Sequence, residues 1–156
     1  MKSTRRLGLV AMLVVLGAVL AAPAALAHKS WKSKSSYELL PPAVGSPEPN
    51  ASGQWTLSTF DRQYWGQDDV DVKCRGLTPG QQYSVVVRVW CMADGWLVGM
   101  RVEYRTLVAD RRGRLECQFP NVARWSSDPF AGTYWEYVGD VWVEDDQGNI
   151  VLDSLF

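Results

Sequence analysis

The chain has 156 residues, enough for one domain with a sizeable core, and its formal net charge is −1. This near balance argues against nucleic-acid binding, because neutralising phosphates requires a concentrated basic face. The single histidine, His28, excludes Ser-His-Asp and Cys-His nucleophile systems, since the rest of the chain has no histidine to act as the base.

The first 27 residues are predicted to be an export signal. Lys2, Arg5 and Arg6 precede an uncharged apolar run over residues 7–20, and Ala25-Leu26-Ala27 is a small-residue cleavage site. No cysteine lies at this site, and no later run reaches the roughly 20 apolar residues of a membrane span. We therefore expect a secreted, periplasmic or extracellular product without a membrane span. Losing three basic residues gives it a net charge of about −4.

Residues 28–53 are predicted to form a flexible, basic and proline-rich tail. Lysines alternate with serines at its start, and four prolines that break regular structure follow, at Pro41, Pro42, Pro47 and Pro49. Asn50-Ala51-Ser52 matches an N-glycosylation acceptor, a motif that matters only in a eukaryotic source.

Residues 54–156 are predicted to form one all-β domain, because apolar and polar residues alternate with period two and no segment has a helical period. Asp94-Gly95 is a strong hairpin signal, and residues 120–133 are expected to be a polar crossover. About seven strands are expected, around residues 55–59, 70–75, 83–91, 98–105, 115–119, 135–143 and 150–156. Strands without intervening helices favour an antiparallel β-sandwich.

The segment Leu77–Tyr83, LTPGQQY, resembles the tyrosine corner of fibronectin type III and related immunoglobulin-like domains. The resemblance implies a sandwich of that class, in which the Tyr83 hydroxyl bonds back to the backbone and pins a corner whose turn contains Pro79 and Gly80. The chain departs from fibronectin type III in having four predicted strands after the corner strand.

Three cysteines in an exported chain allow one disulfide. Cys74 and Cys91 are expected at opposite ends of the sandwich, roughly 25 Å apart, beyond the reach of a disulfide. Cys117 is expected at the same end as Cys74. We therefore predict a Cys74–Cys117 bridge with Cys91 free and buried, and the alternative is that no disulfide forms.

Eight tryptophans are the most informative feature of the composition. Trp55 and Trp135 fall on positions predicted to face the core, whereas Trp90 and Trp142 fall on the opposite register of their strands. Outward aromatic residues predict a binding patch, made of Trp90, Trp142, Val86, Trp96 and Trp65. The alternative is that residues 31–40, or a second layer, cover them.

These residues favour a non-catalytic interaction or structural module whose partner is a cell-surface protein or a polysaccharide, with no cofactor and no metal. A carbohydrate-binding module using exposed tryptophans is the first alternative. A small secreted enzyme or metal carrier is the second. Cleavage would make His28 the first residue, which resembles the copper site of lytic polysaccharide monooxygenases, but that site needs a further histidine. A Ca²⁺ site among residues 68–71 is also considered, although no EF-hand-like spacing is present.

Overall fold

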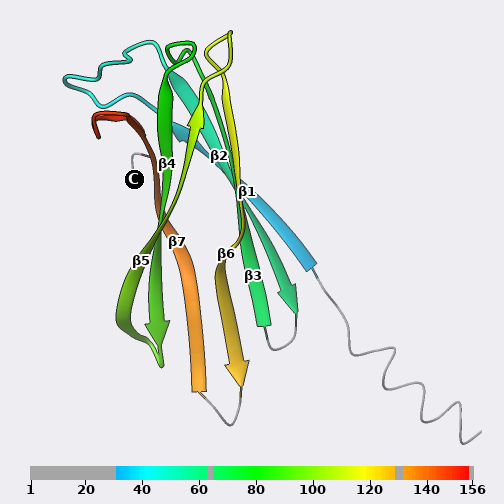
Figure 1. Ribbon diagram of the computed structural model, residues 1–156. Coiled ribbons are helices and arrows are strands. Elements are labelled where there is room, and N and C mark those ends of the chain that lie inside the picture. Colours follow the sequence, from blue (N-terminus) through cyan, green and yellow to red (C-terminus); the bar gives the residue numbers. More distant parts are fainter. Residues whose placement is uncertain (1–30, 63–64, 129–131, 155–156) are drawn as a thin grey trace, which may run out of the picture.

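The computed structural model describes residues 31–62, 65–128 and 132–154 (Figure 1). These residues form eight antiparallel strands: β1 (Trp31–Leu39), β2 (Ser52–Arg62), β3 (Trp65–Arg75), β4 (Gln82–Ala93), β5 (Trp96–Val108), β6 (Leu115–Asp128), β7 (Gly132–Asp145) and β8 (Ile150–Asp153). The predicted export signal lies outside the described residues. No helical segment able to span a lipid bilayer occurs within the described part of the chain.

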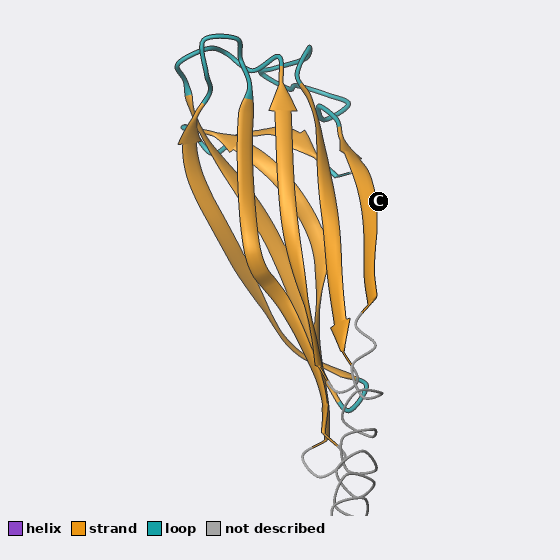
Figure 2. Cartoon of the chain, turned by 90° about the vertical axis from the view of Figure 1, so that its right-hand side faces the viewer, coloured by secondary structure: helices purple, strands orange, loops and turns teal. Residues whose placement is uncertain are grey.

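The strands form one hydrogen-bonded sheet in the order β1-β2-β3-β6-β7-β4-β5, with β8 beside β7, and this sheet folds into two layers. One layer is β1-β2-β3-β6 and the other is β8-β7-β4-β5. They are joined where residues 125–128 of β6 pair with residues 132–135 of β7. The two groups of strands diverge towards this end in Figure 1, and most loops gather at the other end in Figure 2. This confirms an all-β antiparallel fold, consistent with the immunoglobulin-like and fibronectin type III-like class.

The inner faces of both layers meet in one hydrophobic core. Trp55 of β2, Val72 of β3 and Cys117 of β6 lie opposite one another in turn, and Trp55 is 1% exposed. Facing them, β4 contributes three fully buried valines, and β7 and β8 add further buried apolar side chains: Val85, Val87, Val89, Val141, Val143, Val151 and Leu152. The alternation predicted for β4 therefore identifies the side chains of this strand that face the core.

Residues 31–39, expected to belong to the flexible tail, instead form β1 along the edge of β2. Two side chains hold this strand in place. Tyr37 stacks on Trp55 with ring centroids 4.3 Å apart, and Leu39 is fully buried. The alternating lysines and serines at the start of the strand hide this short apolar signal, because within residues 32–39 only Tyr37 and Leu39 are apolar side chains packed on the core.

The following loop is also fixed, through Glu48. The buried Tyr83 accepts a hydrogen bond from the Thr78 backbone N–H at 3.0 Å and donates its hydroxyl proton to the Glu48 carboxylate at 2.6 Å. The Thr78 hydroxyl donates to the same carboxylate at 2.7 Å. In the turn between them, Gly80 has a positive φ of 77°, which glycine adopts without steric cost. Tyr83 thus ties the turn before β4 to a loop 35 residues upstream.

The segment expected to be a crossover is mostly strand, because β6 continues to Asp128. Pro120 fits within it because a bulge opposite residues 68–70 removes this position from the ladder. At the bulge Asn121 has a φ of 54°, and its backbone N–H donates to the Asp69 carboxylate at 2.7 Å. This aspartate, considered for Ca²⁺ binding, therefore has a structural partner.

The predicted Cys74–Cys117 disulfide is wrong, since all three thiols are free. The two cysteines do lie on neighbouring strands, but Cys74 pairs with Leu115 and Cys117 pairs with Val72. This register makes them diagonal neighbours, roughly 7–8 Å apart, whereas a disulfide needs Cα atoms within about 6.8 Å. Burial raises the pKa of the Cys74 thiol to about 12. Cys91 is half-buried rather than buried.

The hydrogen bonds of Tyr83 generate a stability prediction. Burial, together with the hydrogen bond to Glu48, raises the pKa of Tyr83 to about 12. Its protonated hydroxyl therefore stabilises the fold below about pH 10, the pKa in the unfolded chain, and that contribution is lost as the pH rises through about 12. Tyr83→Phe should lower the free energy of unfolding by about 1–2 kcal/mol at pH 7, measured by urea denaturation.

The matched control is Tyr104→Phe, because Tyr104 is 71% exposed, and it should have almost no effect. The difference in the free energy of unfolding between wild type and Tyr83→Phe should decrease as the pH rises from 10 to about 12. A gap that stays constant over this range, or an equal loss in the control, would contradict the role given to Tyr83.

Candidate functional site

The strand β5 has its polarity reversed relative to the core. Its apolar residues Met100, Val102 and Tyr104 are exposed. The charged residues between them lie opposite buried valines of β4, and Arg101 is half-buried whereas Glu103 is exposed. The Arg101 guanidinium lies 2.8 Å from the Glu136 carboxylate, and the Arg105 guanidinium lies 5.6 Å from the ring centre of Phe119. The period-two alternation thus places the apolar stripe in solvent.

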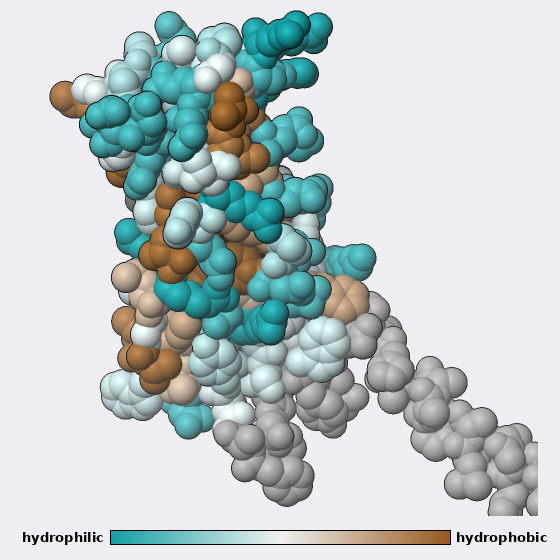
Figure 3. Space-filling model, viewed as in Figure 1, coloured by the Kyte–Doolittle hydropathy of each residue, from teal (hydrophilic) through white to brown (hydrophobic). Residues whose placement is uncertain are grey.

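Residues directly opposite on neighbouring strands share a face, so the pairing of β5, β4 and β7 defines one surface. Its rows are Tyr104 with Val86 and Trp142, Val102 with Arg88 and Asp140, and Met100 with Trp90 and Tyr137. We call it the β5–β4–β7 face and include the next pair, Met92 and Trp135. Figure 3 shows hydrophobic side chains gathered on the side of the molecule where β5 and β4 lie.

A bulge at Gly139 extends this face by two aromatic residues. The register between β4 and β7 shifts after Arg88, so that Val138 pairs with Val89 and Tyr137 pairs with Trp90. A one-residue slip turns every following side chain to the other face of the sheet. Trp135, predicted to face the core, is therefore 45% exposed, and that prediction is wrong.

In the middle of the face, Trp90 and Trp142 pack on either side of Arg88. The guanidinium carbon lies 5.1 Å from the ring centre of Trp142 and 5.9 Å from that of Trp90, within cation–π range. One guanidinium nitrogen bonds the Asp140 carboxylate at 2.9 Å. Val86 beneath them is 5% exposed. These side chains form the buried centre of the face. The exposed side chains that a partner could contact lie on either side of them, on β5 and at the start of β7.

The structure brings together three of the five residues predicted to form the binding patch, Val86, Trp90 and Trp142. The other two lie elsewhere. Trp96 is 77% exposed but pairs with Ala93, in the opposite register from Trp90. Trp65 lies in the other layer, with its ring centre 6.1 Å from that of Phe60. Sequence reasoning missed Tyr104, Trp135 and Tyr137, and only the alternation in β5 signalled the first of these.

At the β6–β7 junction the face continues into a cavity of about 590 Å³, lined by Met92, Trp125, Trp135, Glu136 and Tyr137. Glu136 accepts hydrogen bonds from Arg101 and from the Tyr134 hydroxyl, the latter at 2.9 Å. Burial alone would raise the pKa of Glu136, but these hydrogen bonds outweigh it and hold the pKa below its ordinary value. The cavity therefore presents apolar walls and a carboxylate that already has partners.

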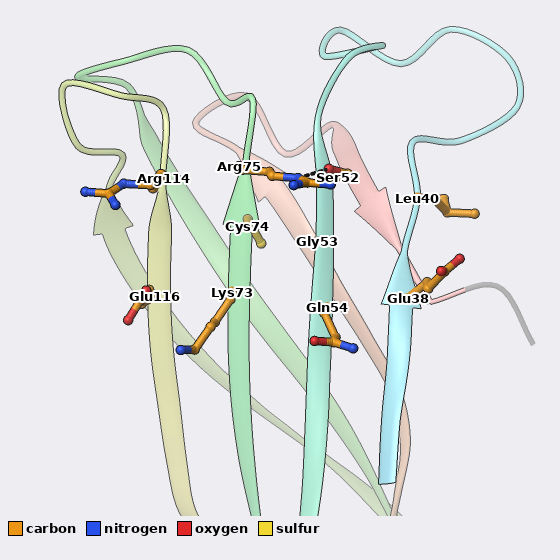
Figure 4. Close-up of a pocket in the computed structure, with 10 residues that line it drawn as sticks. All are labelled: Glu38, Leu40, Ser52, Gly53, Gln54, Lys73, Cys74, Arg75, Arg114 and Glu116. Carbon is orange, nitrogen blue, oxygen red and sulfur yellow. Dashed lines mark hydrogen bonds between the residues drawn. The ribbon is translucent and has the colours of Figure 1, made fainter.

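The outer face of the other layer is polar. Glu38, Gln54, Lys73 and Glu116 pair in turn across four strands and project outwards along a cavity of about 560 Å³ (Figure 4). Alternating charges of this kind are typical of a solvated sheet surface. Within the described residues no group of three or more histidine, cysteine, aspartate or glutamate side chains lies close enough to hold a metal ion.

The contact between Gly139 and Trp90 can be tested directly. A Cβ atom at position 139 would lie 2.2 Å from the indole nitrogen of Trp90, so Gly139→Ala must displace the indole. We expect a loss of about 1–3 kcal/mol in the free energy of unfolding and a changed tryptophan fluorescence spectrum. Gly99→Ala is the matched control, because a Cβ atom there meets nothing within 4 Å. Equal stability of the two variants would argue against the bulge.

Comparisons with known proteins identify no relative: no protein-family model matches the chain, and no curated protein or solved structure matches it. The resemblance to fibronectin type III and immunoglobulin-like domains therefore stays a prediction from LTPGQQY. The function has to be argued from the geometry of the β5–β4–β7 face.

Proposed function

We propose that this chain is an exported, non-catalytic binding module that uses the β5–β4–β7 face to hold an apolar surface of a partner protein. The observation that carries the proposal is the reversed polarity of β5, whose apolar stripe is exposed while Arg101 pairs with Glu136 and Arg105 lies over the Phe119 ring. Contiguous exposed apolar surface of this kind marks interaction sites in soluble proteins. The export signal predicted over residues 1–27 supports a partner outside the cytoplasm.

The polar groups of the face favour a protein partner over a sugar. Arg88 is paired with Asp140, and Glu136 is bonded to Arg101 and Tyr134. Small polar ligands are held in orientation by a few well-placed polar groups beside apolar walls, and these groups already have intramolecular partners. An apolar or aromatic anchor from a protein would instead fill the cavity beside Trp135 and Tyr137 without needing them.

Carbohydrate binding is the second candidate, favoured by the aromatic walls of the same cavity. Trp125 and Trp135 pair directly across β6 and β7, and Tyr137 lies beside them. Flat aromatic faces of this kind stack on sugar rings. Titration with a panel of soluble polysaccharides, followed by tryptophan fluorescence, separates the two candidates: a saturable change supports the sugar reading, and no response supports a protein partner.

The protein-binding proposal is tested with Trp135→Ala and Tyr137→Ala, two variants at the exposed end of the face. Wild-type protein is immobilised, partners are captured from the exported proteins of the source organism, and affinity for the captured partner is measured by surface plasmon resonance. Each variant should weaken binding at least about tenfold, as expected for an aromatic residue at the centre of an interface.

Trp96→Ala is the matched control, because it also removes an exposed tryptophan but not one from this face. It should bind like wild type, and circular dichroism should show that all three variants are folded. Undiminished binding by the two face variants, or an equal loss in the control, would overturn the proposal.

A further inference from the structure

We infer that the end of the sheet next to the β4–β5 turn inserts into the interface of a lipid bilayer. At this end β5, β4, β7, β6 and β3 pair side by side as one continuous sheet (Figure 1). Two rows of directly paired residues cross these strands, and we call them together the terminal belt. The first row is Trp96, Ala93, Tyr134, Ser126 and Trp65, and the second is Leu97, Met92, Trp135, Trp125 and Gly66.

The belt exposes large side chains on both faces of the sheet. Consecutive residues of a strand point to opposite faces, so the first row lies on one face and the second row on the other. In the first row Trp96 is 77% exposed, and Tyr134 and Trp65 are also exposed. In the second row Leu97 is 56% exposed, and Trp135 is exposed beside it. Aromatic and apolar side chains therefore meet solvent on both faces at the same level of the molecule.

This distribution favours a lipid interface over a protein partner at this end. A folded partner docks against one face of a sheet and leaves the opposite face in water. A bilayer surrounds the segment that enters it and covers both faces. Tryptophan and tyrosine are the residues enriched at membrane–water interfaces, because their rings combine an apolar body with a polar group.

The distribution of charge supports the same orientation. No residue of the belt is charged, and charged residues enter the two rows only on β2, at Asp61 and Arg62. In the β4–β5 turn the Asp94 carboxylate accepts a hydrogen bond from the Thr133 backbone N–H at 3.1 Å. The turns at the opposite end carry exposed charged side chains, and hydrophilic residues predominate there in Figure 3: Asp110, Arg111, Arg112 and Asp146.

Lipid binding goes beyond the proposed function and can be separated from it. Met92 and Trp135 belong both to the terminal belt and to the β5–β4–β7 face, so neither is changed in the tests. Trp96 lies on the opposite face of the sheet from Trp135, because it pairs with Ala93 and not with Met92. A variant at Trp96 therefore tests lipid binding while leaving the partner-binding face intact.

The first test is cosedimentation of the full chain with phosphatidylcholine vesicles, which wild type should bind. Trp96→Ala should lower the partition coefficient at least about tenfold, because burial of a large aromatic side chain is lost. Tyr104→Ala is the matched control and should bind like wild type. Tyr104 is 71% exposed on the same strand but lies eight residues, roughly 26 Å, farther from the turn. Circular dichroism checks that both variants are folded.

The second test asks whether both faces enter the lipid. Single cysteines are introduced in a Cys91→Ser background, which removes the only thiol that is not buried, and are labelled with the environment-sensitive fluorophore NBD. Ser126→Cys reports the first row, Leu97→Cys reports the second, and Tyr104→Cys is the control. Vesicles should shift the NBD emission to the blue at positions 126 and 97 but not at position 104.

Three results would each overturn the inference. The first is wild-type protein that stays in the supernatant with phosphatidylcholine vesicles. The second is an equal loss of vesicle binding in Trp96→Ala and Tyr104→Ala. The third is an NBD shift at only one of positions 126 and 97, which would mean that the protein docks by one face instead of inserting its end.

Discussion

The pairing of β4 with β7 determines which side chains are buried and which are presented to solvent. In the part of β4 that precedes Arg88, the two strands pair valine with valine, Val85 with Val143 and Val87 with Val141, and all four are fully buried. After Arg88, the bulge at Gly139 changes the register between β4 and β7, and the aromatic side chains of β7 turn outwards. The indole of Trp90 packs against Gly139. The glycine at the register shift therefore also leaves the space that this indole occupies.

The β5–β4–β7 face follows from this arrangement. Arg88 lies within cation–π distance of both Trp90 and Trp142 and is bonded to Asp140, which links the three side chains at the centre of the face. The inward side chain of Arg101 is accommodated because it pairs with Glu136 of β7 in the same layer and reaches the backbone carbonyl of Val122, on β6 in the other layer. With Arg101 paired in this way, β5 leaves its apolar stripe exposed, and a partner that covers this stripe would remove apolar surface from water.

Local pattern predicted much of the fold. The alternation in β4, the Asp94-Gly95 hairpin with φ values of 48° and 83°, and the burial of Trp55 are confirmed. Contacts between distant segments could not be predicted in this way. Glu48 reaches Tyr83 from a proline-rich loop, and Tyr37 makes a strand of a segment that looks like a tail. A glycine in a strand suggests a bulge, but only the pairing partner shows that Trp135 and Tyr137 face outwards.

Hydroxyl-radical footprinting with mass spectrometry tests the central claim most directly, because it reports the solvent accessibility of individual aromatic side chains in the intact protein. The account predicts that Trp135 and Tyr137 are oxidised far faster than the buried Trp55 and Tyr83. Protection of Trp135 to the same extent as Trp55 would place it in the core, remove the bulge at Gly139, and contradict the existence of the β5–β4–β7 face.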